Sequence, residues 1–229
     1  DRQIREALAD YTIESAMGFL LDAEQDTLDI ADLTVFEIEE LMGLGDKFAL
    51  PTLLYLFRRI ERALAGQPAV IVLDEAWLML GHPVFREKLR EWLKTLRKAN
   101  CAVIMATQSL SDAANSGIFD VILESTPTKI LLPNVHAREE EASKLYRAIG
   151  LNKREIEILA TAVPKRDYYY TSPKGKRLYS LAIGPLAMTV VGASDKESIA
   201  KIKALQAEHE HEWLGEWFKE CGITMEEAA

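Results

Sequence analysis

Apolar residues in the first third of the chain recur mainly at helical spacing. Ile4 and Leu8 begin a broken amphipathic pattern. Residues 48–64 carry apolar side chains on one side and charged side chains on the other, which predicts an amphipathic helix. A Gly-Gln-Pro sequence at 66–68 ends this helix, and residues 34–38 are a candidate short strand.

The centre of the chain alternates continuous apolar runs with helical patterns. Residues 69–73 and 102–107 are apolar runs, as expected for parallel strands buried on both faces, and residues 129–132 form a third. The helices predicted beside these strands cover residues 85–96, 137–149 and 153–161. This alternation predicts an α/β fold with a mostly parallel sheet flanked by helices.

The pattern changes after Pro164. Residues 167–171 and 178–183 flank a Ser-Pro-Lys-Gly turn and predict a hairpin. Residues 186–191 are expected to be another short strand or an extended segment, and 195–220 to be an acidic helix broken near 212–215. The domains that we expect are a helical N-terminal segment (1–33), an α/β core (34–192) and an acidic helical appendage (193–229).

Composition and charge restrict the possible functions. The 229 residues are 48% hydrophobic and 28% charged, which suits one α/β domain with or without an appendage. The formal net charge of −9 argues against a surface wholly devoted to nucleic acid, because that binding needs Lys and Arg to neutralise phosphates. The charge is uneven: Asp22 to Asp46 contains nine acidic residues and no basic one, whereas Val84 to Lys98 contains six basic and two acidic residues.

Cysteine and histidine offer no metal or redox motif. Cys101 and Cys221 are far apart, so a reducing cytosolic compartment is expected. His209 and His211 point to different faces of a predicted helix and are interpreted as solvated side chains. No apolar stretch is long enough to cross a membrane, and the N-terminus does not resemble a signal peptide. Because the sequence begins with Asp1 rather than Met, we expect a fragment or a processed product.

The strongest chemical signal is the apolar run that ends in Asp74 and Glu75. A buried parallel strand delivers the residues at its carboxyl end to the crevice where α/β sheets bind ligands. This is the pattern of a Walker B strand, in which Asp74 holds Mg²⁺, commonly through water, and Glu75 polarises the attacking water. The alternative is a strand that ends in an ordinary polar turn.

The next strand ends in Gln108. An amide at this position can sense the terminal phosphate of ATP or orient the attacking water. Alternatively, Gln108 is a loop or capping amide, and Ser109 and Ser111 are themselves candidate caps of the following helix. Two neighbouring strands that both end in suitable chemistry favour the catalytic interpretation.

A basic stripe lies between these strands, formed by Arg86, Arg90, Lys94 and Arg97. In ring-shaped ATPases an arginine crosses the subunit boundary to stabilise charge on the phosphates. Arg97 is the first candidate for this role and Arg166 the second. The alternative is a solvated helix face.

No phosphate-binding loop of the form G-x-x-x-x-G-K-[ST] occurs in the sequence. The segment at 42–48 has glycines and a lysine, but it lacks the glycine spacing, the Ser or Thr and a preceding buried strand. It is interpreted as a loop before a helix. We therefore expect the chain alone to bind ATP poorly.

Three segments together resemble the TrbE/CagE kind of conjugal-transfer ATPase, namely Leu73–Trp77, Trp92–Lys98 and Ala106–Asp112. The similarity continues through Thr128–Asn134 and covers about residues 34–190. The resemblance implies a RecA-like P-loop motor core that uses ATP and Mg²⁺, in a type IV secretion system. In this family the phosphate loop lies upstream of every segment present here.

The resemblance further implies a hexameric or otherwise oligomeric ATPase at the cytoplasmic face of the bacterial inner membrane, with other secretion components as partners and roles in pilus assembly and substrate transfer. Two alternatives remain open. One is a non-catalytic assembly or docking fragment whose acidic C-terminal helix contacts partners. The other is a related DNA-pumping motor, although the acidic charge disfavours it and leaves direct binding to DNA open.

Overall fold

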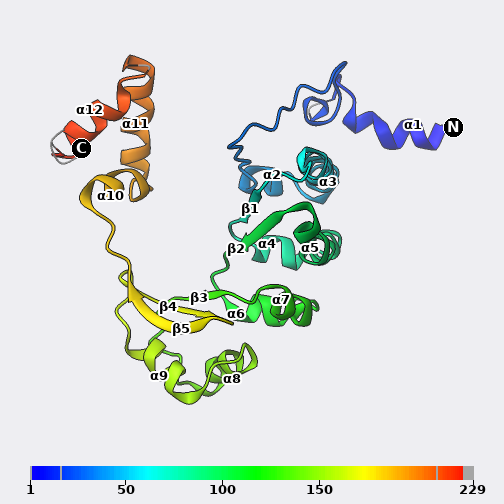
Figure 1. The fold of residues 1–229 in the computed structure, drawn as a ribbon. Coiled ribbons are helices and arrows are strands. Elements are labelled where there is room, and N and C mark those ends of the chain that lie inside the picture. Colours follow the sequence, from blue (N-terminus) through cyan, green and yellow to red (C-terminus); the bar gives the residue numbers. More distant parts are fainter. Residues whose placement is uncertain (1, 16, 210, 224–229) are drawn as a thin grey trace. The chain divides into compact units, whose positions relative to one another are not determined.

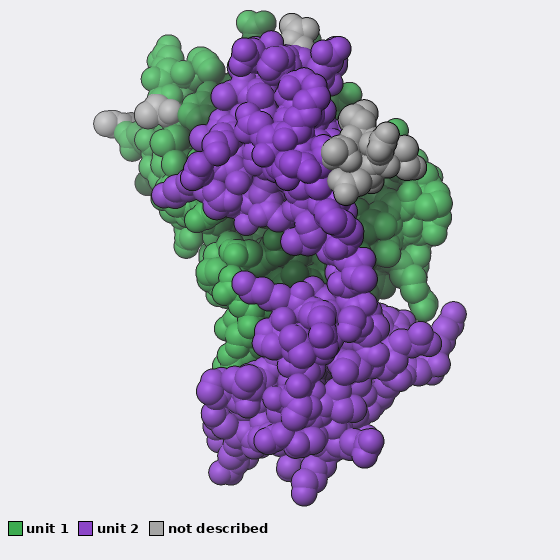
Figure 2. Space-filling view, turned by 90° about the vertical axis from the view of Figure 1, so that its left-hand side faces the viewer, with its two compact units in different colours: residues 1–127 green, residues 128–229 purple. Residues whose placement is uncertain are grey.

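The structure is a computed structural model that describes residues 2–15, 17–209 and 211–223. The chain divides into two compact units, residues 1–127 and 128–229, which Figure 2 colours separately. Each unit is described by itself below. The domain boundaries predicted after residues 33 and 192 stay predictions.

Unit 1 combines a parallel strand pair with helices (Figure 1). Its N-terminal part contains α1 (Arg2–Leu8), η1 (Ala9–Tyr11), η2 (Gly18–Leu20), α2 (Glu39–Gly43) and α3 (Asp46–Ala63). The remainder contains β1 (Ala69–Leu73), α4 (Trp77–Gly81), α5 (Pro83–Thr95), η3 (Leu96–Ala99), β2 (Cys101–Met105), α6 (Leu110–Ala114) and α7 (Phe119–Ser125). The helix predicted over residues 48–64 is therefore confirmed as α3.

One face of the β1–β2 pair packs against the core, and the other face is exposed. The strands run parallel, with Ala69 opposite Cys101 and Leu73 opposite Met105. Leu73 belongs to an apolar cluster with residues of α3 and α5, among them Phe57, Leu89 and Trp92. On the other face, three large side chains remain 54–63% exposed, those of Val70, Val72 and Ile104. This face of the strand pair has no cover within the described residues, so the expectation that the strands are buried on both faces is not met.

A partly buried polar contact ties α3 to α5. The indole Nε1 of Trp92 donates a hydrogen bond of 2.7 Å to Oε1 of Glu61, which also forms an ion pair with Lys88. Burial acts to raise the pKa of Glu61, but the hydrogen bonds from Lys88 and Trp92 outweigh it and leave the pKa below its usual value. The Phe57 ring packs edge-on against Trp92, with centroids 4.8 Å apart. These contacts fix the helix that joins β1 to β2.

Unit 2 begins with a three-stranded antiparallel sheet in the order β3-β4-β5. Its strands are β3 (Lys129–Leu131), β4 (Asp167–Ser172) and β5 (Gly175–Ser180). Its helices are α8 (Glu140–Ala148), α9 (Lys153–Thr161), α10 (Pro185–Val191), α11 (Lys196–His209) and α12 (Trp213–Glu220). The predicted hairpin and the predicted helices at 137–149 and 153–161 are confirmed, and the acidic C-terminal helix is divided into α11 and α12.

Three expectations about secondary structure are wrong. Residues 129–132 were expected to be a third strand of the parallel sheet, but β3 pairs antiparallel with β4, with Ile130 opposite Tyr170. Residues 186–191 form most of α10, because Pro185 at its first turn favours a helix start. Residues 34–38 form no strand, since no neighbouring segment pairs with them within the described residues.

Candidate functional site

The candidate site lies where the carboxyl ends of β1 and β2 meet. Beyond the last paired residues, the amide of Ala106 donates to the carbonyl of Leu73 over 2.9 Å. The carbonyl of Ala106 in turn accepts from the amide of Ala76 over 2.9 Å. These bonds hold the chain on both sides of Asp74 and Glu75, so the two carboxylates leave the sheet at one defined point.

Glu75 has an unusual backbone conformation for a residue with a side chain. Its φ of 51° lies in the left-handed region, which costs an L-residue about 1–2 kcal/mol. The turn is closed by a 3.0 Å bond from the Leu78 amide to the Glu75 carbonyl, and the Glu75 amide donates over 3.0 Å to Oδ1 of Asp74. Such a conformation is typical of residues that the surrounding structure holds in place for function.

Gln108 reaches from the end of β2 to Glu75. Its Nε2 donates a hydrogen bond of 3.2 Å to Oε1 of Glu75. The cap of α6 is Ser109, whose hydroxyl accepts from the Ser111 amide over 3.1 Å. The Gln108 amide is therefore not the helix cap, and it contacts the side chain predicted to be the base. Asp74, Glu75 and Gln108 are all exposed, so a ligand can reach them.

The donors at this edge suit Mg²⁺ that is held jointly with phosphates. Mg²⁺ is usually bound through one or two carboxylates together with phosphate oxygens and water. The Asp74 and Glu75 carboxylates, exposed and adjacent, can supply that share. Within the described ranges, no group of three or more His, Cys, Asp or Glu residues could hold a metal by itself. The site therefore fits Mg²⁺ only with a phosphate ligand present.

The glycine-bearing segment at 42–48 was expected to be a loop before a helix, but only Leu44 and Gly45 lie between helices, because residues 42–43 end α2 and residues 46–48 begin α3. Gly45, with φ of 81°, precedes α3, and the element before it is the short helix α2 rather than a strand. Lys47 forms an ion pair with Asp10. A phosphate-binding lysine would follow a buried strand and be free to reach the phosphates, so this segment lacks both features.

Arg97 lies at the opposite edge of the strand pair from Glu75. It belongs to η3, which leads into β2 at Cys101, whereas Glu75 follows the other end of β1. The length of the strand separates the two edges by about 13 Å at a rise of about 3.3 Å per residue. Arg97 therefore does not belong to the site of its own chain. The second candidate, Arg166, is in unit 2, where its Nε donates over 3.1 Å to Oδ1 of Asp167.

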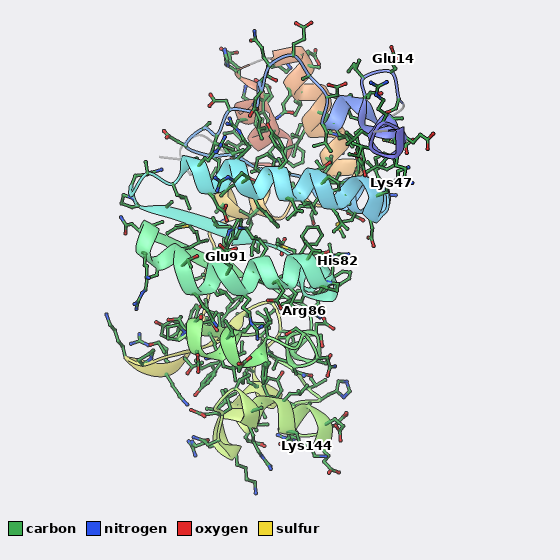
Figure 3. All side chains as sticks on the ribbon, turned by 90° about the vertical axis from the view of Figure 1, so that its right-hand side faces the viewer. Glu14, Lys47, His82, Arg86, Glu91 and Lys144 are labelled. Carbon is green, nitrogen blue, oxygen red and sulfur yellow. The ribbon has the colours of Figure 1, made fainter. Side chains whose placement is uncertain are left out.

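A pocket beside the site was not predicted. It has a volume of ≈ 310 Å³, and Trp77, which begins α4 just after Glu75, is part of its wall. The polar side chains of the wall are Arg86, Asp112, Asn115 and Ser116. Figure 3 shows Arg86 at the same end of α5 as His82, away from Glu91. The stripe at 86–97 contained Arg86, but no sequence signal separated it from Arg90 or Lys94.

Comparisons with known proteins agree with this fold. A family model described as the TraG P-loop domain matches residues 2–172. The chain is 58% identical over 223 residues to the conjugal transfer protein TrbE of Rhizobium radiobacter, which covers 97% of this chain and 27% of that protein. It is 38% identical over 115 residues to the type IV secretion system protein CagE of Helicobacter pylori, over 50% of this chain and 11% of that protein. The chain spans about a quarter of the length of the TrbE protein that it matches.

A solved structure of VirB4 from Thermoanaerobacter pseudethanolicus is also similar. It aligns with a TM-score of 0.62 at 19% sequence identity, over 81% of this chain and 51% of that chain. At that identity the likeness bears on the fold alone. It confirms the predicted α/β class, with a parallel strand pair and helices consistent with a RecA-like core.

Proposed function

This chain belongs to the TraG P-loop domain family, and we propose that it is the hydrolysing portion of a conjugal-transfer ATPase of a type IV secretion system. The observation that carries the proposal is the contact between Gln108 and Glu75. Two side chains that follow neighbouring parallel strands meet beside Asp74, at the edge where open α/β sheets bind ligands.

Each of the three residues has a distinct role in the proposed mechanism. Asp74 would hold Mg²⁺ together with the ATP phosphates, and the ion would supply positive charge beside the phosphate oxygens. Glu75 accepts a proton from the attacking water. Gln108 fixes the Glu75 carboxylate through the 3.2 Å hydrogen bond and so keeps its orientation toward that water.

The phosphate loop, in this proposal, is supplied by protein outside these 229 residues. The sequence contains no G-x-x-x-x-G-K-[ST], and residues 42–48 form a different structure. The exposed face of the β1–β2 pair supports the same view, because parallel sheets are normally covered on both faces. Without that loop, the chain alone should show no ATPase activity and feeble nucleotide affinity.

Arg97 is proposed to act on a neighbouring subunit. It lies at the edge of the strand pair away from its own Glu75, so it is not placed to act in the site of its own chain. An arginine that completes a neighbour's site requires an oligomer, which we propose to be a hexamer. Arg166 is the second candidate for the same role.

We propose that the protein acts at the cytoplasmic face of the bacterial inner membrane, with other type IV secretion components as partners. Its proposed roles are pilus assembly and substrate transfer. The names of the relatives support it, since TrbE is a conjugal transfer protein and CagE a type IV secretion system protein. No helix in the described part of the chain is long and apolar enough to cross a membrane. A peripheral association with the membrane is part of the same proposal.

Calorimetry tests the proposal with two proteins, this chain and a version extended through its phosphate loop. ATP with Mg²⁺ should bind tightly to the extended protein only, and Asp74→Asn should remove the magnesium dependence of that binding. Lys47→Ala is the control and should change nothing. Tight binding by the 229-residue chain that Lys47→Ala abolishes would make residues 43–47 an unconventional phosphate loop and overturn the proposal. An extended protein that binds no ATP would instead support an assembly role.

A further inference from the structure

The face of the β3–β4–β5 sheet that carries Tyr168 and Tyr170 is rich in aromatic side chains. Residues two apart on a strand share a face, so these two rings lie on the same side of β4. On the neighbouring strand β5, Tyr179 lies directly opposite Tyr168, and Arg177 lies opposite Tyr170. Three tyrosines and one arginine thus occupy adjacent positions on two strands, and we call this set the tyrosine face.

The tyrosine face is not needed for the core of unit 2. The alternate residues of β4 point the other way and are buried, with Asp167, Tyr169 and Thr171 at 4–8% exposure. The Tyr169 hydroxyl donates over 3.1 Å to Oε1 of Glu155 on α9, which completes that side. The side chains of Tyr168 and Tyr170 are only half-buried. The chain therefore keeps large rings at a surface where packing does not demand them.

Two of the three rings are stacked on each other, and the polar tips of all three have no partner among the described residues. Tyr168 and Tyr179 are stacked, with centroids 5.6 Å apart and planes inclined by 24°. Within the described residues, no hydrogen bond or ion pair engages the hydroxyls of Tyr168, Tyr170 and Tyr179 or the guanidinium of Arg177. By contrast, Lys176 on the opposite face pairs with Glu155 over 2.8 Å. Lys176 is thus neutralised by a carboxylate, whereas Arg177 is not.

The charge around this sheet is the reverse of the charge of the whole chain. Residues 128–180 contain eleven basic and six acidic side chains, although the chain carries a net charge of −9. Lys174 in the turn of the hairpin and Arg177 beside it add positive charge at the edge of the tyrosine face. The excess of positive charge in this segment favours an anionic ligand there.

We propose that the tyrosine face binds single-stranded nucleic acid. Aromatic rings stack on nucleobases without sequence preference, and arginine contacts the phosphates and stacks as well. Rings on adjacent strands of an antiparallel sheet are a known geometry for stacking successive bases. A membrane or a purely apolar partner would match free hydroxyls and an unpaired guanidinium less well. This inference goes beyond the proposed ATPase function and requires no nucleotide hydrolysis.

Fluorescence anisotropy of a labelled oligothymidylate with the 229-residue chain, without ATP, tests the proposal. Tyr170→Ala should weaken binding about tenfold or more, because stacking on one ring contributes that much. Tyr170→Phe should keep most of the affinity, since it retains the ring. Arg177→Gln should weaken binding more than the matched control Arg154→Gln, which removes an exposed arginine from α9. Circular dichroism confirms that each variant is folded.

Two further probes separate the possible ligands. A duplex of the same length should bind more weakly, because its bases are not available for stacking. A labelled oligouridylate shows whether single-stranded RNA binds as well as DNA does, and binding of either one supports the proposal. No binding at low salt would overturn it. So would a Tyr170→Ala variant with unchanged affinity, which would leave only non-specific attraction by lysines and arginines or assign the face to contacts with protein. Because ATP is omitted, neither outcome bears on the proposed hydrolysis.

Discussion

Gln108 and Glu75, 33 residues apart in the sequence, are joined by a hydrogen bond of 3.2 Å from the amide of one to the carboxylate of the other. Each residue follows the end of its strand, and the parallel register of Leu73 with Met105 brings the two ends together. The left-handed backbone of Glu75 then turns its side chain beside that of Gln108. The carboxylate proposed as the catalytic base is thus held in place by a neutral amide, which forms no ion pair with it.

Gln108→Ala should lower turnover of the protein that includes its phosphate loop by about 10²-fold, a typical contribution of one positioned group. The affinity for ATP should change little, because Gln108 acts on the base. Steady-state kinetics and nucleotide titration measure the two quantities separately. Ser109→Ala is the matched control: it should cost about 1 kcal/mol of stability through loss of the α6 cap and leave turnover near that of wild type. A Gln108→Ala protein with normal turnover and reduced stability would show that Gln108 is only structural.

Arg97→Ala should lose activity although its own Asp74, Glu75 and Gln108 are intact. Mixing it with an excess of Glu75→Gln subunits should restore part of the hydrolysis, because an intact Glu75 then faces an intact arginine from its neighbour. Activity is measured across mixing ratios, with Lys94→Ala as the control from the same basic stripe. Near-wild-type activity of Arg97→Ala would show that Arg97 only lies on a solvated helix face, where a charge contributes little. Loss without rescue would make Arg166 the better candidate.

Asp167 gives the stability of unit 2 a defined pH dependence. Its carboxylate accepts hydrogen bonds from the Val163 amide, the Ser180 hydroxyl and Arg166, which lower its pKa from 3.8 to about 2. A pKa lowered by folding contributes stability that is present above about pH 4 and is lost as the pH falls toward 2. Asp167→Asn should therefore lower the melting temperature by several degrees at pH 7, and the difference from wild type should shrink below pH 4.

Thermal unfolding followed by circular dichroism at pH 7, 4 and 2.5 measures this difference. The control is Glu157→Gln, which removes an exposed carboxylate paired with Arg138 on the same unit. Exposed pairs contribute little, so this control should stay close to wild type at every pH. A difference between Asp167→Asn and wild type that is the same at all three pH values would contradict the assigned role.

Much of the site could be predicted because it depends on strand ends. Val70 to Leu73 is an apolar run followed by two carboxylates, and a similar run ends just before Gln108. Both patterns are typical of parallel strands that deliver polar side chains to a ligand site. The place of Arg97 also follows from connectivity. The segment before the second strand of a βαβ unit returns to the amino edge, so Arg97 had to lie away from Glu75.

The expectations that proved wrong concern short segments whose pairing partners cannot be identified from the sequence. The apolar run at 129–132 is equally suitable for a parallel or an antiparallel strand, and pairing with Tyr169 and Tyr170 decided the outcome. The run at 186–191 has neither helical nor strand periodicity, and the Gly184-Pro185 start was the informative signal. The pocket beside Trp77 depends on how α4, α5 and α6 pack, which no local pattern encodes.

The most direct test of the account is the turnover and ATP affinity of Glu75→Gln, measured in the protein that includes its phosphate loop. The substitution keeps the shape of the side chain but removes the base, while Asp74 remains to hold Mg²⁺. The account predicts a loss of hydrolysis to background, with the dissociation constant for ATP within a few-fold of that of wild type. Turnover within a few-fold of wild type would contradict the assignment of Glu75 and, with it, the proposed site.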